Sequence, residues 1–446
     1  MDMCSGPLLG KILIFALPLM LSSILQLLFN AADIIVVGKY VGPQALAAVG
    51  STSSLINLLI NVFIGFSVGT NVLAARYYGA GVQREASQVV HTSIAFSLLC
   101  GVVLIFLGLF LSGPMLTLMG TPDDVLDQAT LYMRIYFSGM PIIMLYNFGN
   151  AVLRAVGDTR RPLYFLSAAG VLNVIMNLIF VTQLHMGVEG VALATVLSQI
   201  LSAALIVRCL MKSDGVYRLH LKKLKIHKTR LVQIIKIGLP AGMQGAIFSI
   251  SNVLIQSSIN TFGSIAMAGS TAAANIEGFV YMAMNAFHQT ALSFTSQNYG
   301  AGRMDRVKRI MLLCISCVTL TGLLMGVACF FFGPQLLGIY SSDPKVIEFG
   351  MIRLTLICLP YFLCGLMDVM VGCIRGLGYS FMPMIVSLAG ACGLRILWVF
   401  TIFQMNPTLQ TLYLSYPVTW GITAVCHFIC FALLFYRLKK RKRQAL

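Results

Sequence analysis

The stretch SILQLLFNAADIIVVGKY, residues 23–40, places one carboxylate, Asp33, inside a run of leucine, isoleucine and valine. Apolar segments of about 20 residues form helices that cross the hydrocarbon of a membrane. A charged side chain at the centre of such a helix costs about 2.5 to 3.5 kcal/mol unless it meets a partner or a wet cavity. The stretch therefore predicts a membrane-spanning helix that carries a functional acid.

The whole chain shares this apolar character. Of its 446 residues, 58% are hydrophobic and only 10% are charged, and the mean hydropathy is +0.87. Soluble domains carry about a quarter charged residues, so we expect an all-α integral membrane protein. Twelve transmembrane helices are predicted, over residues 12–38, 45–75, 87–112, 128–153, 163–182, 188–210, 231–259, 266–297, 307–332, 346–374, 381–405 and 412–436.

The distribution of basic residues predicts the orientation of these helices. The formal net charge is +17, and with the N-terminus inside, all but five of the 31 Lys and Arg lie in or near inner segments. Inner loops of membrane proteins carry such an excess. We therefore expect a multi-pass protein of a bacterial-type plasma membrane with both termini in the cytoplasm. Since no aromatic or basic module accompanies the charge, we expect no nucleic-acid partner.

Other classes of function lack support in the sequence. The twelve cysteines are scattered through apolar segments, and the CxxC pair of Cys314 and Cys317 has no second pair or nearby histidine, so we expect no structural metal. No HExxH, Walker A or GxSxG motif occurs in a usable context, so we expect neither an enzyme nor an organic cofactor.

The two halves of the chain repeat one another at an offset of about 221 residues. Matching segments are YYGAG (77–81) with NYGAG (298–302), ALP (16–18) with GLP (238–240), YMRIYFSGMP (132–141) with MIRLTLICLP (351–360), and LRAVGDTRRP (153–162) with IRGLGYSFMP (374–383). Six helices in each half give both halves the same orientation. This is the plan of transporters that rock two bundles around a site between them.

The repeat predicts the domain organisation. We expect two pseudo-symmetric six-helix bundles over residues 1–211 and 231–437, a basic cytoplasmic linker over 212–230, and a basic cytoplasmic tail over 438–446. Proline inside a helix removes a backbone hydrogen bond and bends it. The candidates for hinges, with a fixed bend as the equal alternative, are Pro18, Pro141, Pro240 and Pro360.

Polar residues of other helices are predicted to lie level with Asp33. At about 1.5 Å per residue, Asp33, Asn177 and Thr195 each lie six residues from an outer helix end. Asn173 lies one turn below Asn177 on the same face. Oxygen ligands around a carboxylate suit a proton or a hard cation such as sodium. These residues therefore form a candidate ion-coupling site, and the alternative is that Asp33 only joins helices.

The second half has ionisable candidates of its own. Glu277 and Arg395 lie at matching depths, so we expect them to pair or to approach through water, in a structural or a coupling role. Asp368 is expected at an inner gate or turned toward Arg375. The candidates for a substrate cavity, with packing as the alternative, are Gln26, Asn30, Gln244, Asn252, Gln256, Met282, His288 and Gln289.

The duplicated plan, VGKYVGPQALAAVG after Asp33, YYGAG and LRAVGDTRRP together resemble the multidrug and toxic compound extrusion (MATE) family over essentially the whole chain. The resemblance implies two six-helix lobes around a central cavity. It also implies export of mostly cationic, lipophilic compounds in exchange for protons or sodium. Asp33, Asn173, Asn177 and Thr195 match the positions of the family's cation site in the first lobe.

The sequence departs from the family pattern in ways that leave the coupling ion open. Some members have an aspartate where this chain has Asn177. The segment GLPAGMQGAIFSISNVLIQ (238–256) lacks the glutamate that vibrio-type, sodium-coupled members use in the second lobe. Glu277 and Arg395 instead resemble a subgroup that is common among bacterial efflux proteins.

Two functions are compatible with these observations. The first is a secondary antiporter that exports organic cations, drugs or dyes by alternating access. The alternative is a flippase for a lipid-linked saccharide or cell-wall precursor, which would favour cationic residues in its cavity to hold pyrophosphate. Because the candidates here are mainly acidic or neutral, we favour the antiporter. We expect small-molecule substrates, contact with membrane lipids, and a monomer.

Overall fold

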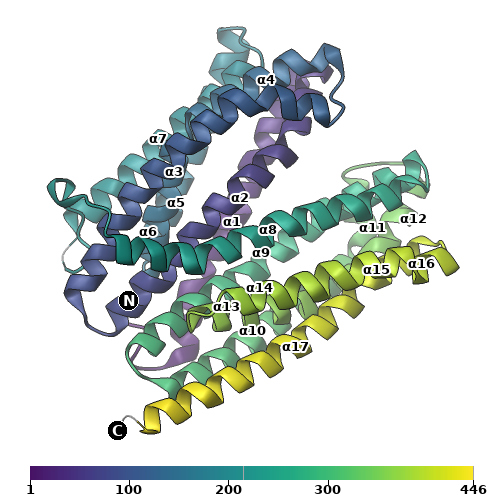
Figure 1. Cartoon of the computed structure of the whole chain (residues 1–446). Coiled ribbons are helices and arrows are strands. Elements are labelled where there is room, and N and C mark those ends of the chain that lie inside the picture. The colour runs from purple at the N-terminus through teal and green to yellow at the C-terminus, as the bar shows by residue number, and fades with distance from the viewer. Residues whose placement is uncertain (214, 445–446) are drawn as a thin grey trace. The chain divides into compact units, whose positions relative to one another are not determined.

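The computed structural model describes residues 1–213 and 215–444, and within these ranges it consists of helices and their connections, without strands (Figure 1). The first half contains α1 (Leu8–Val36), α2 (Pro43–Gly79), α3 (Gln83–Leu118), α4 (Asp123–Ser138), α5 (Met140–Ala155), α6 (Arg160–Leu178) and α7 (Val188–Lys212). The second half contains α8 (Lys228–Asn260), α9 (Ser264–Gly300), α10 (Met304–Phe331), α11 (Gly333–Gly338), α12 (Pro344–Arg353), α13 (Phe362–Gly376), α14 (Phe381–Ser387), α15 (Arg395–Phe400), α16 (Ile402–Met405) and α17 (Leu409–Gln444).

Short π-helical turns extend or interrupt several of these helices. They are η1 (Val37–Val41), η2 (Ile179–Gln183), η4 (Leu354–Cys358) and η5 (Leu388–Leu394). A single 3₁₀ turn, η3 (Leu221–Lys223), lies in the segment between α7 and α8. Such turns relieve the regular hydrogen-bond ladder and are frequent at functional positions.

All twelve segments expected from the sequence are helical. Among the described residues, nine helices are long and apolar enough to cross a membrane. A tenth span is the pair Pro344–Cys358 and Phe362–Gly376, which bends by 43° where Pro360 breaks it. The pair α4 and α5, together with the 37-residue α9, covers the remaining two predicted segments. The prediction of an all-α integral membrane protein is therefore confirmed.

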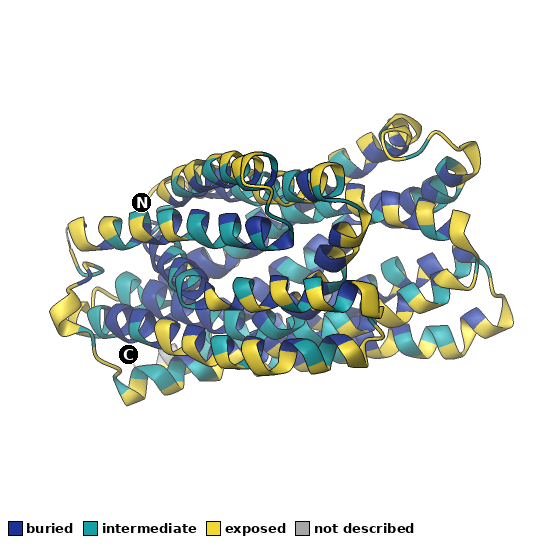
Figure 2. Cartoon of the chain, turned by 90° about the horizontal axis from the view of Figure 1, so that it is seen from above, coloured by how far each residue is buried: buried dark blue, intermediate teal, exposed yellow. Residues whose placement is uncertain are grey.

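The outward faces of the helices are apolar, as a lipid environment requires. Leu320, Leu324 and Phe331 lie on one stripe of α10, with 60, 63 and 69% of their surface exposed. In Figure 2, exposed and buried residues alternate along the same helices. Water-soluble proteins rarely expose continuous apolar surface of this kind. The exposed stripes identify the surface that meets the hydrocarbon.

The chain forms two compact units that exchange the starts of their first helices. The first unit contains Met1–Asp2 and Leu21–Ala246, and the second contains Met3–Met20 and Ile247–Leu446. The N-terminal part of α1 thus belongs to the second unit, and the N-terminal part of α8 belongs to the first. The division expected at the linker follows the sequence repeat and does not include this exchange.

In the first unit, glycines bring the start of α8 against α2. Gly65 and Gly69 on α2 face Gly238 and Gly242 on α8, and both pairs have the GxxxG spacing. A Cβ atom added at Gly65 or Gly242 would overlap the backbone of the facing helix. Small residues at this spacing let two membrane helices approach with their backbones in contact. This contact explains why residues before Ile247 belong to the first unit.

In the second unit, large side chains hold the start of α1. Phe15 packs edge-on against Phe294 of α9, with ring centroids 5.4 Å apart. The backbone N–H of Met3 donates to Gln297 Oε1 at 3.1 Å, and both Met3 and Phe15 belong to the hydrophobic core of this unit. The two exchanged helix starts are thus fixed by different packing chemistry.

An arginine in each unit links the start of an exchanged helix, or the segment just before it, to the repeated segments YYGAG (77–81) and NYGAG (298–302). In the first unit, Arg230 Nη1 donates to the Tyr77 hydroxyl at 2.7 Å and Arg230 Nε to Gln88 Oε1 at 3.1 Å. In the second unit, Arg306 Nε donates to Asn298 Oδ1 at 3.1 Å, and its Nη2 to the carbonyl of Ser5 at 3.1 Å. The repeat therefore preserves the anchoring role, although the arginines come from different elements.

The four candidate hinge prolines fall into two structural classes. Pro18 and Pro240 lie inside the unbroken helices α1 and α8. Pro141 opens α5 after the break at Gly139, and Pro360 lies in the break between η4 and α13. The first two are close to the exchange points at Met20 and Ala246. Movement about any of them stays a prediction.

The glycine contact between α2 and α8 can be tested with a matched pair of substitutions. Gly242→Ala should lower the stability of the protein by about 1 to 3 kcal/mol, because the new methyl group meets the backbone of Val62. Gly245→Ala, one turn along the same helix, should be neutral or slightly stabilising, because its nearest neighbour, Asn61, leaves van der Waals room. Thermal unfolding of the purified protein measures both, and equal effects would contradict the proposed contact.

The linker before α8 should detach from α3 more readily at acidic pH. The N–H of His220 donates to His91 Nε2, and that of His227 to Thr92 Oγ1, each at 3.1 Å. Partial desolvation, followed by the charges of Lys225 and other basic neighbours, lowers the pKa of His227. Desolvation and then nearby Lys223 likewise lower the pKa of His220.

Because both pKa values are lower in the docked state, the undocked linker binds more protons, and docking weakens as the pH falls below about 6.5. Hydrogen exchange of linker amides, corrected for intrinsic rates, should therefore show less protection at pH 5.5 than at pH 7.5. The double substitution His220→Gln and His227→Gln should flatten this difference. Peptides from α4, which contains no histidine, serve as the internal control.

Candidate functional site

Asp33 lies at one end of a hydrogen-bonded chain that joins α1, α6 and α7. Asn177 Nδ2 donates to Asp33 Oδ1 and, at 3.3 Å, to Asn173 Oδ1. Asn173 Nδ2 donates to Thr195 Oγ1 at 3.4 Å, and the Thr195 hydroxyl donates to the carbonyl of Val191 at 3.0 Å. The structure therefore brings together Asp33, Asn177 and Thr195, which the sequence placed in one layer, and Asn173, which it placed one turn below.

Local sequence explains how α1 and α6 come close enough for this chain. Asn173 and Asn177 are one turn apart on α6 and project from the same face. Gly170 lies a turn earlier, and a Cβ atom there would overlap the ring of Phe29 on α1. The glycine lets the two helices approach, and Asp33, one turn beyond Phe29, reaches the amide of Asn177.

A small polar cavity borders this chain. Its volume is about 50 Å³, and its walls include Gln26, Asn30, Asp33, Asn173 and Thr195. A cavity that size has room for a few water molecules or a small cation. Gln26 and Asn30, two candidates for a substrate cavity, line this small space beside Asp33, and their role in substrate binding stays a prediction. The carboxyl group therefore borders a space that is lined in part by polar side chains and is large enough for water.

Two further wall residues were not predicted. Ser198 and Gln199 line the same cavity, three and four positions after Thr195 on α7. This spacing puts all three on one helix face. The sequence contained the signal, because a polar face that continues for two turns in an apolar helix marks a cavity wall.

The donor set of the site is dominated by oxygen. Asn177 Oδ1 is buried and accepts no hydrogen bond from the described residues. The Asp33 carboxylate and the Thr195 hydroxyl line the cavity and are hard oxygen ligands of the kind that sodium takes, and the carboxylate can equally hold a proton. Among the described residues, no group of three or more His, Cys, Asp or Glu is arranged to hold a metal ion.

The second unit contains a buried ion pair that the sequence assigned to the wrong partner. Glu277 on α9 accepts two hydrogen bonds from Arg353, from Nε and Nη2, each at 2.8 Å. Arg353 Nη1 also donates to Ser270 Oγ at 2.7 Å. All three nitrogens of the guanidinium group therefore bond to side chains of α9. The expected direct pair of Glu277 and Arg395 is therefore wrong, because Glu277 pairs with Arg353, whereas an approach of Glu277 and Arg395 through water stays a prediction. Counting residues gave a common depth but not the direction in which each helix face points.

Arg395 is instead surrounded by aromatic rings. Its guanidinium lies 4.0 Å from the ring centroid of Tyr416 and 5.8 Å from that of Trp420, and Nη2 donates to Thr419 Oγ1 at 3.3 Å. Only 2% of Arg395 is exposed. Contacts with ring faces stabilise a cation in a low-dielectric environment. Arg395 is therefore stabilised without the carboxylate of Glu277.

Asp368 belongs to a separate polar cluster of the second unit. His288 Nδ1 bonds to the Asp368 backbone carbonyl at 2.6 Å, and Asn285 Nδ2 donates to the Tyr281 hydroxyl at 3.4 Å. The orientation of Asp368 toward Arg375 and a role at an inner gate both stay predictions.

The remaining candidates for a substrate cavity do not line the space beside Asp33. Gln244 is buried in the first unit, and Asn252 is exposed on α8. Gln256 donates to Asn260 Oδ1 at 3.0 Å on the same helix. Met282 and Gln289 are half-buried on α9. Their role in substrate binding stays a prediction.

Comparison with known proteins places these features in context. A family model described as MatE matches residues 18–179 and 240–401, one segment in each half. The chain is 27% identical over 421 residues to "Probable multidrug resistance protein YoeA" of Bacillus subtilis, covering 92% of this chain and 90% of that protein. It is 24% identical over 353 residues to "FAD transporter" of Shewanella oneidensis, covering 77% of each.

The fold is also found among solved structures. A structure described as the outward-facing conformation of a multidrug resistance MATE family transporter matches with a TM-score of 0.92 and 24% identity, over 98% of both chains. A similarity at this level of identity concerns the fold. Each half of the chain thus corresponds to one matched segment of the family model, in agreement with the repeat found in the sequence.

Removing one partner of the Glu277–Arg353 ion pair should destabilise the protein more than removing both. Glu277→Met or Arg353→Met alone leaves a buried charged partner uncompensated and should cost about 3 to 5 kcal/mol. The double substitution Glu277→Met and Arg353→Met should be markedly more stable than either. Thermal unfolding of the four proteins completes the cycle. For comparison, Asp158→Asn at the exposed pair with Arg161 should cost less than about 1 kcal/mol.

Proposed function

The chain belongs to the MatE family of multidrug efflux transporters, and from this premise we propose that it exports organic cations, drugs or dyes in exchange for protons or sodium by alternating access. The family is one of transporters of small molecules. The proposal for this chain adds the class of substrate, the antiport and the coupling site. It rests on the arrangement around Asp33.

The single observation that carries the proposal is an acid of a membrane helix that faces a polar cavity and has only an amide as its hydrogen-bond donor. Asp33 accepts from Asn177 and borders the 50 Å³ space. A carboxylate in such surroundings is stabilised by a bound proton or cation. Release of that ion exposes the charge, so occupancy and the shape of the cavity are thermodynamically linked.

The path of α1 supports transmission of this change. Residues up to Met20 pack in the second unit, whereas Asp33 lies in the first. Pro18 removes one backbone hydrogen bond from α1 close to the exchange point. We propose that α1 bends near Pro18 when the ion at Asp33 changes, and that Pro240 serves α8 in the same way.

The coupling ion, the membrane and the assembly complete the proposal. The oxygen ligands suit either a proton or sodium, and the site holds a single carboxylate. The excess of Lys and Arg in alternate loops supports a plasma membrane location of the bacterial type, with both termini in the cytoplasm. A monomer suffices, because each chain contains both units.

A second candidate is a flippase or exporter for an anionic, lipid-linked cargo. The observation that favours it is Arg395, a buried cation held by aromatic rings and Thr419. A pyrophosphate-linked saccharide requires cations in its pathway. The cavity beside Asp33 offers a carboxylate, amides and hydroxyls instead, so export of cationic compounds is the better supported function.

The coupling role of Asp33 can be tested in everted membrane vesicles. The wild-type protein should accumulate a cationic dye when a proton gradient or a sodium gradient is imposed separately, and the gradient that works identifies the ion. Asp33→Asn removes the charge at nearly constant volume and should reduce gradient-driven uptake to the level of empty vesicles. Asp127→Asn, the same change at an exposed position of α4, should leave uptake intact.

The same vesicles separate the alternatives. Equilibrium binding of the dye to purified Asp33→Asn protein shows that the variant is folded. Full gradient-driven uptake by that variant would rule out the proposed site. Transport of an anionic lipid-linked saccharide, without any effect of a cationic dye, would favour the flippase.

A further inference from the structure

A second, larger cavity lies in the first unit, away from the residues around Asp33. It opens between the start of α6 and the end of α7 and has a volume of about 420 Å³. Its walls are Arg161, Phe165, Leu205, Arg208, Cys209 and Lys212. Pockets of 300 to 1,000 Å³ commonly hold small ligands. None of these residues takes part in the proposed ion coupling.

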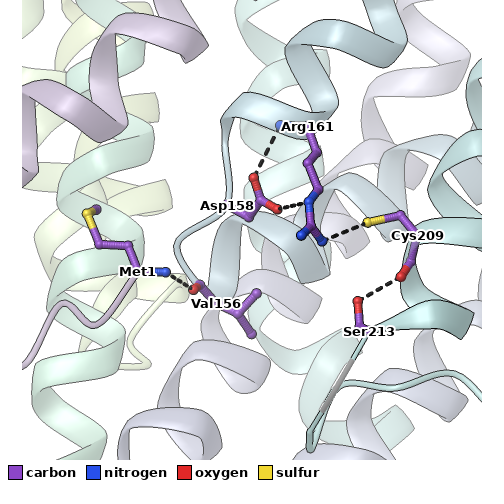
Figure 3. A network of polar contacts seen from close by, with 6 residues as sticks. All are labelled: Met1, Val156, Asp158, Arg161, Cys209 and Ser213. Atoms are coloured by element: carbon purple, nitrogen blue, oxygen red, sulfur yellow. Dashed lines mark hydrogen bonds and ion pairs between the residues drawn. The ribbon is translucent and has the colours of Figure 1, made fainter.

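The rim of this cleft is basic. Arg161 is the second residue of α6, and Arg208 and Lys212 are one turn apart at the end of α7. Figure 3 shows Arg161 held between Asp158 and Cys209, with Nη1 3.4 Å from Cys209 Sγ. Its side chain remains 55% exposed. The cations are therefore ordered in part but still accessible to an anion.

Within the part of the chain that the structure describes, one carboxylate, that of Asp158, forms an ion pair with the basic rim. Asp158 Oδ2 lies 3.3 Å from Arg161 Nε, and Asp158 Oδ1 accepts the backbone N–H of Arg161 at 3.2 Å. The pair leaves the charges of Arg208 and Lys212 in the cleft. The start of the 19-residue α6 adds the positive end of a helix dipole. The local field thus favours an anion.

The deeper wall of the cleft is apolar. Phe165 lies one turn into the helix from Arg161, and Leu205 lies one turn in from Cys209. Farther along α6 the exposed side chains are apolar, as at Ile175, which is 48% exposed. Both helices are membrane spans. A ligand that fits must therefore combine an anionic group at the membrane surface with a hydrocarbon part that extends inward.

We propose that this cleft binds an anionic phospholipid of the inner leaflet. The phosphate and headgroup lie against Arg161, Arg208 and Lys212, and an acyl chain runs along Phe165 and Leu205. Guanidinium groups form charge-assisted hydrogen bonds with phosphate oxygens, and basic pockets between membrane helices suit such headgroups. A free phosphate ion would satisfy the rim but would make no use of the apolar wall.

The experiment counts lipids retained by the purified full-length protein in native mass spectrometry, after incubation with phosphatidylglycerol or with phosphatidylcholine of the same acyl chains. The wild type should prefer phosphatidylglycerol. The triple substitution Arg161→Gln, Arg208→Gln and Lys212→Gln should lower that retention at least about tenfold, because each cation near a headgroup contributes to anionic lipid binding. Phosphatidylcholine retention should not change.

A matched control removes the same charge elsewhere. Lys222→Gln, Lys223→Gln and Lys225→Gln alter exposed side chains of the linker, outside the cleft. This variant should retain phosphatidylglycerol as the wild type does. An equal loss in both triple variants would mean attraction by net charge alone and would overturn the assignment to the cleft.

A substitution that should increase lipid retention keeps the test decisive if the triple variant is unstable. Asp158→Asn removes the charge that competes for Arg161 and keeps an oxygen to accept the Arg161 N–H. It should raise phosphatidylglycerol retention about two- to fivefold. No increase would count against the proposal. Displacement of the bound lipid by excess inorganic phosphate would also overturn it, since that result identifies a free anion as the ligand.

Discussion

The cost of holding a carboxylate among lipid-spanning helices is the constraint on which the arrangement of the first unit depends. Asp33 requires hydrogen-bond donors and a polar space, and both are supplied by α6 and α7. That supply in turn requires Gly170, which lets Phe29 and α1 approach α6. The polar chain from Asp33 through the asparagines to Thr195 thus sets which helices pack together.

The repeat gives both halves the same plan, but the two units solve the same packing problem with different chemistry. The exchanged start of α8 is held by backbone contact at GxxxG motifs, and that of α1 by large apolar side chains such as Phe15. An arginine helps in each case: Arg230 on the first turn of α8 bonds to Tyr77, and Arg306 bonds to Ser5 before α1. The two units thus share a helix arrangement but differ in their buried polar groups, which are the Asp33 cluster in the first unit and the Glu277–Arg353 pair in the second.

The sequence predicted the helices and the Asp33 cluster because both depend on one-dimensional quantities, apolar length and depth along a helix. It did not predict Arg353 as the partner of Glu277, because depth does not give the direction of a helix face. Arg353 lies in the repeated segment MIRLTLICLP (351–360), and the repeat does not indicate its partner. Ser270, which lies two turns before Glu277 on α9 and also binds Arg353, marks the face that would have pointed to it. The exchange of helix starts was likewise invisible to periodicity.

Two of the acids in the spans, Glu277 and Asp33, differ in how their charge is balanced, and this difference separates a structural role from an exchange role. Glu277 has a guanidinium partner in bidentate contact, so the pair is neutral without any further ion. Among the described residues, Asp33 has an uncharged amide as its only hydrogen-bond donor, and a cavity lies beside it. In the proposed mechanism its charge is balanced by a proton or cation that enters through that cavity. Physical chemistry therefore favours Asp33, and not Glu277, as the group whose bound ion can change.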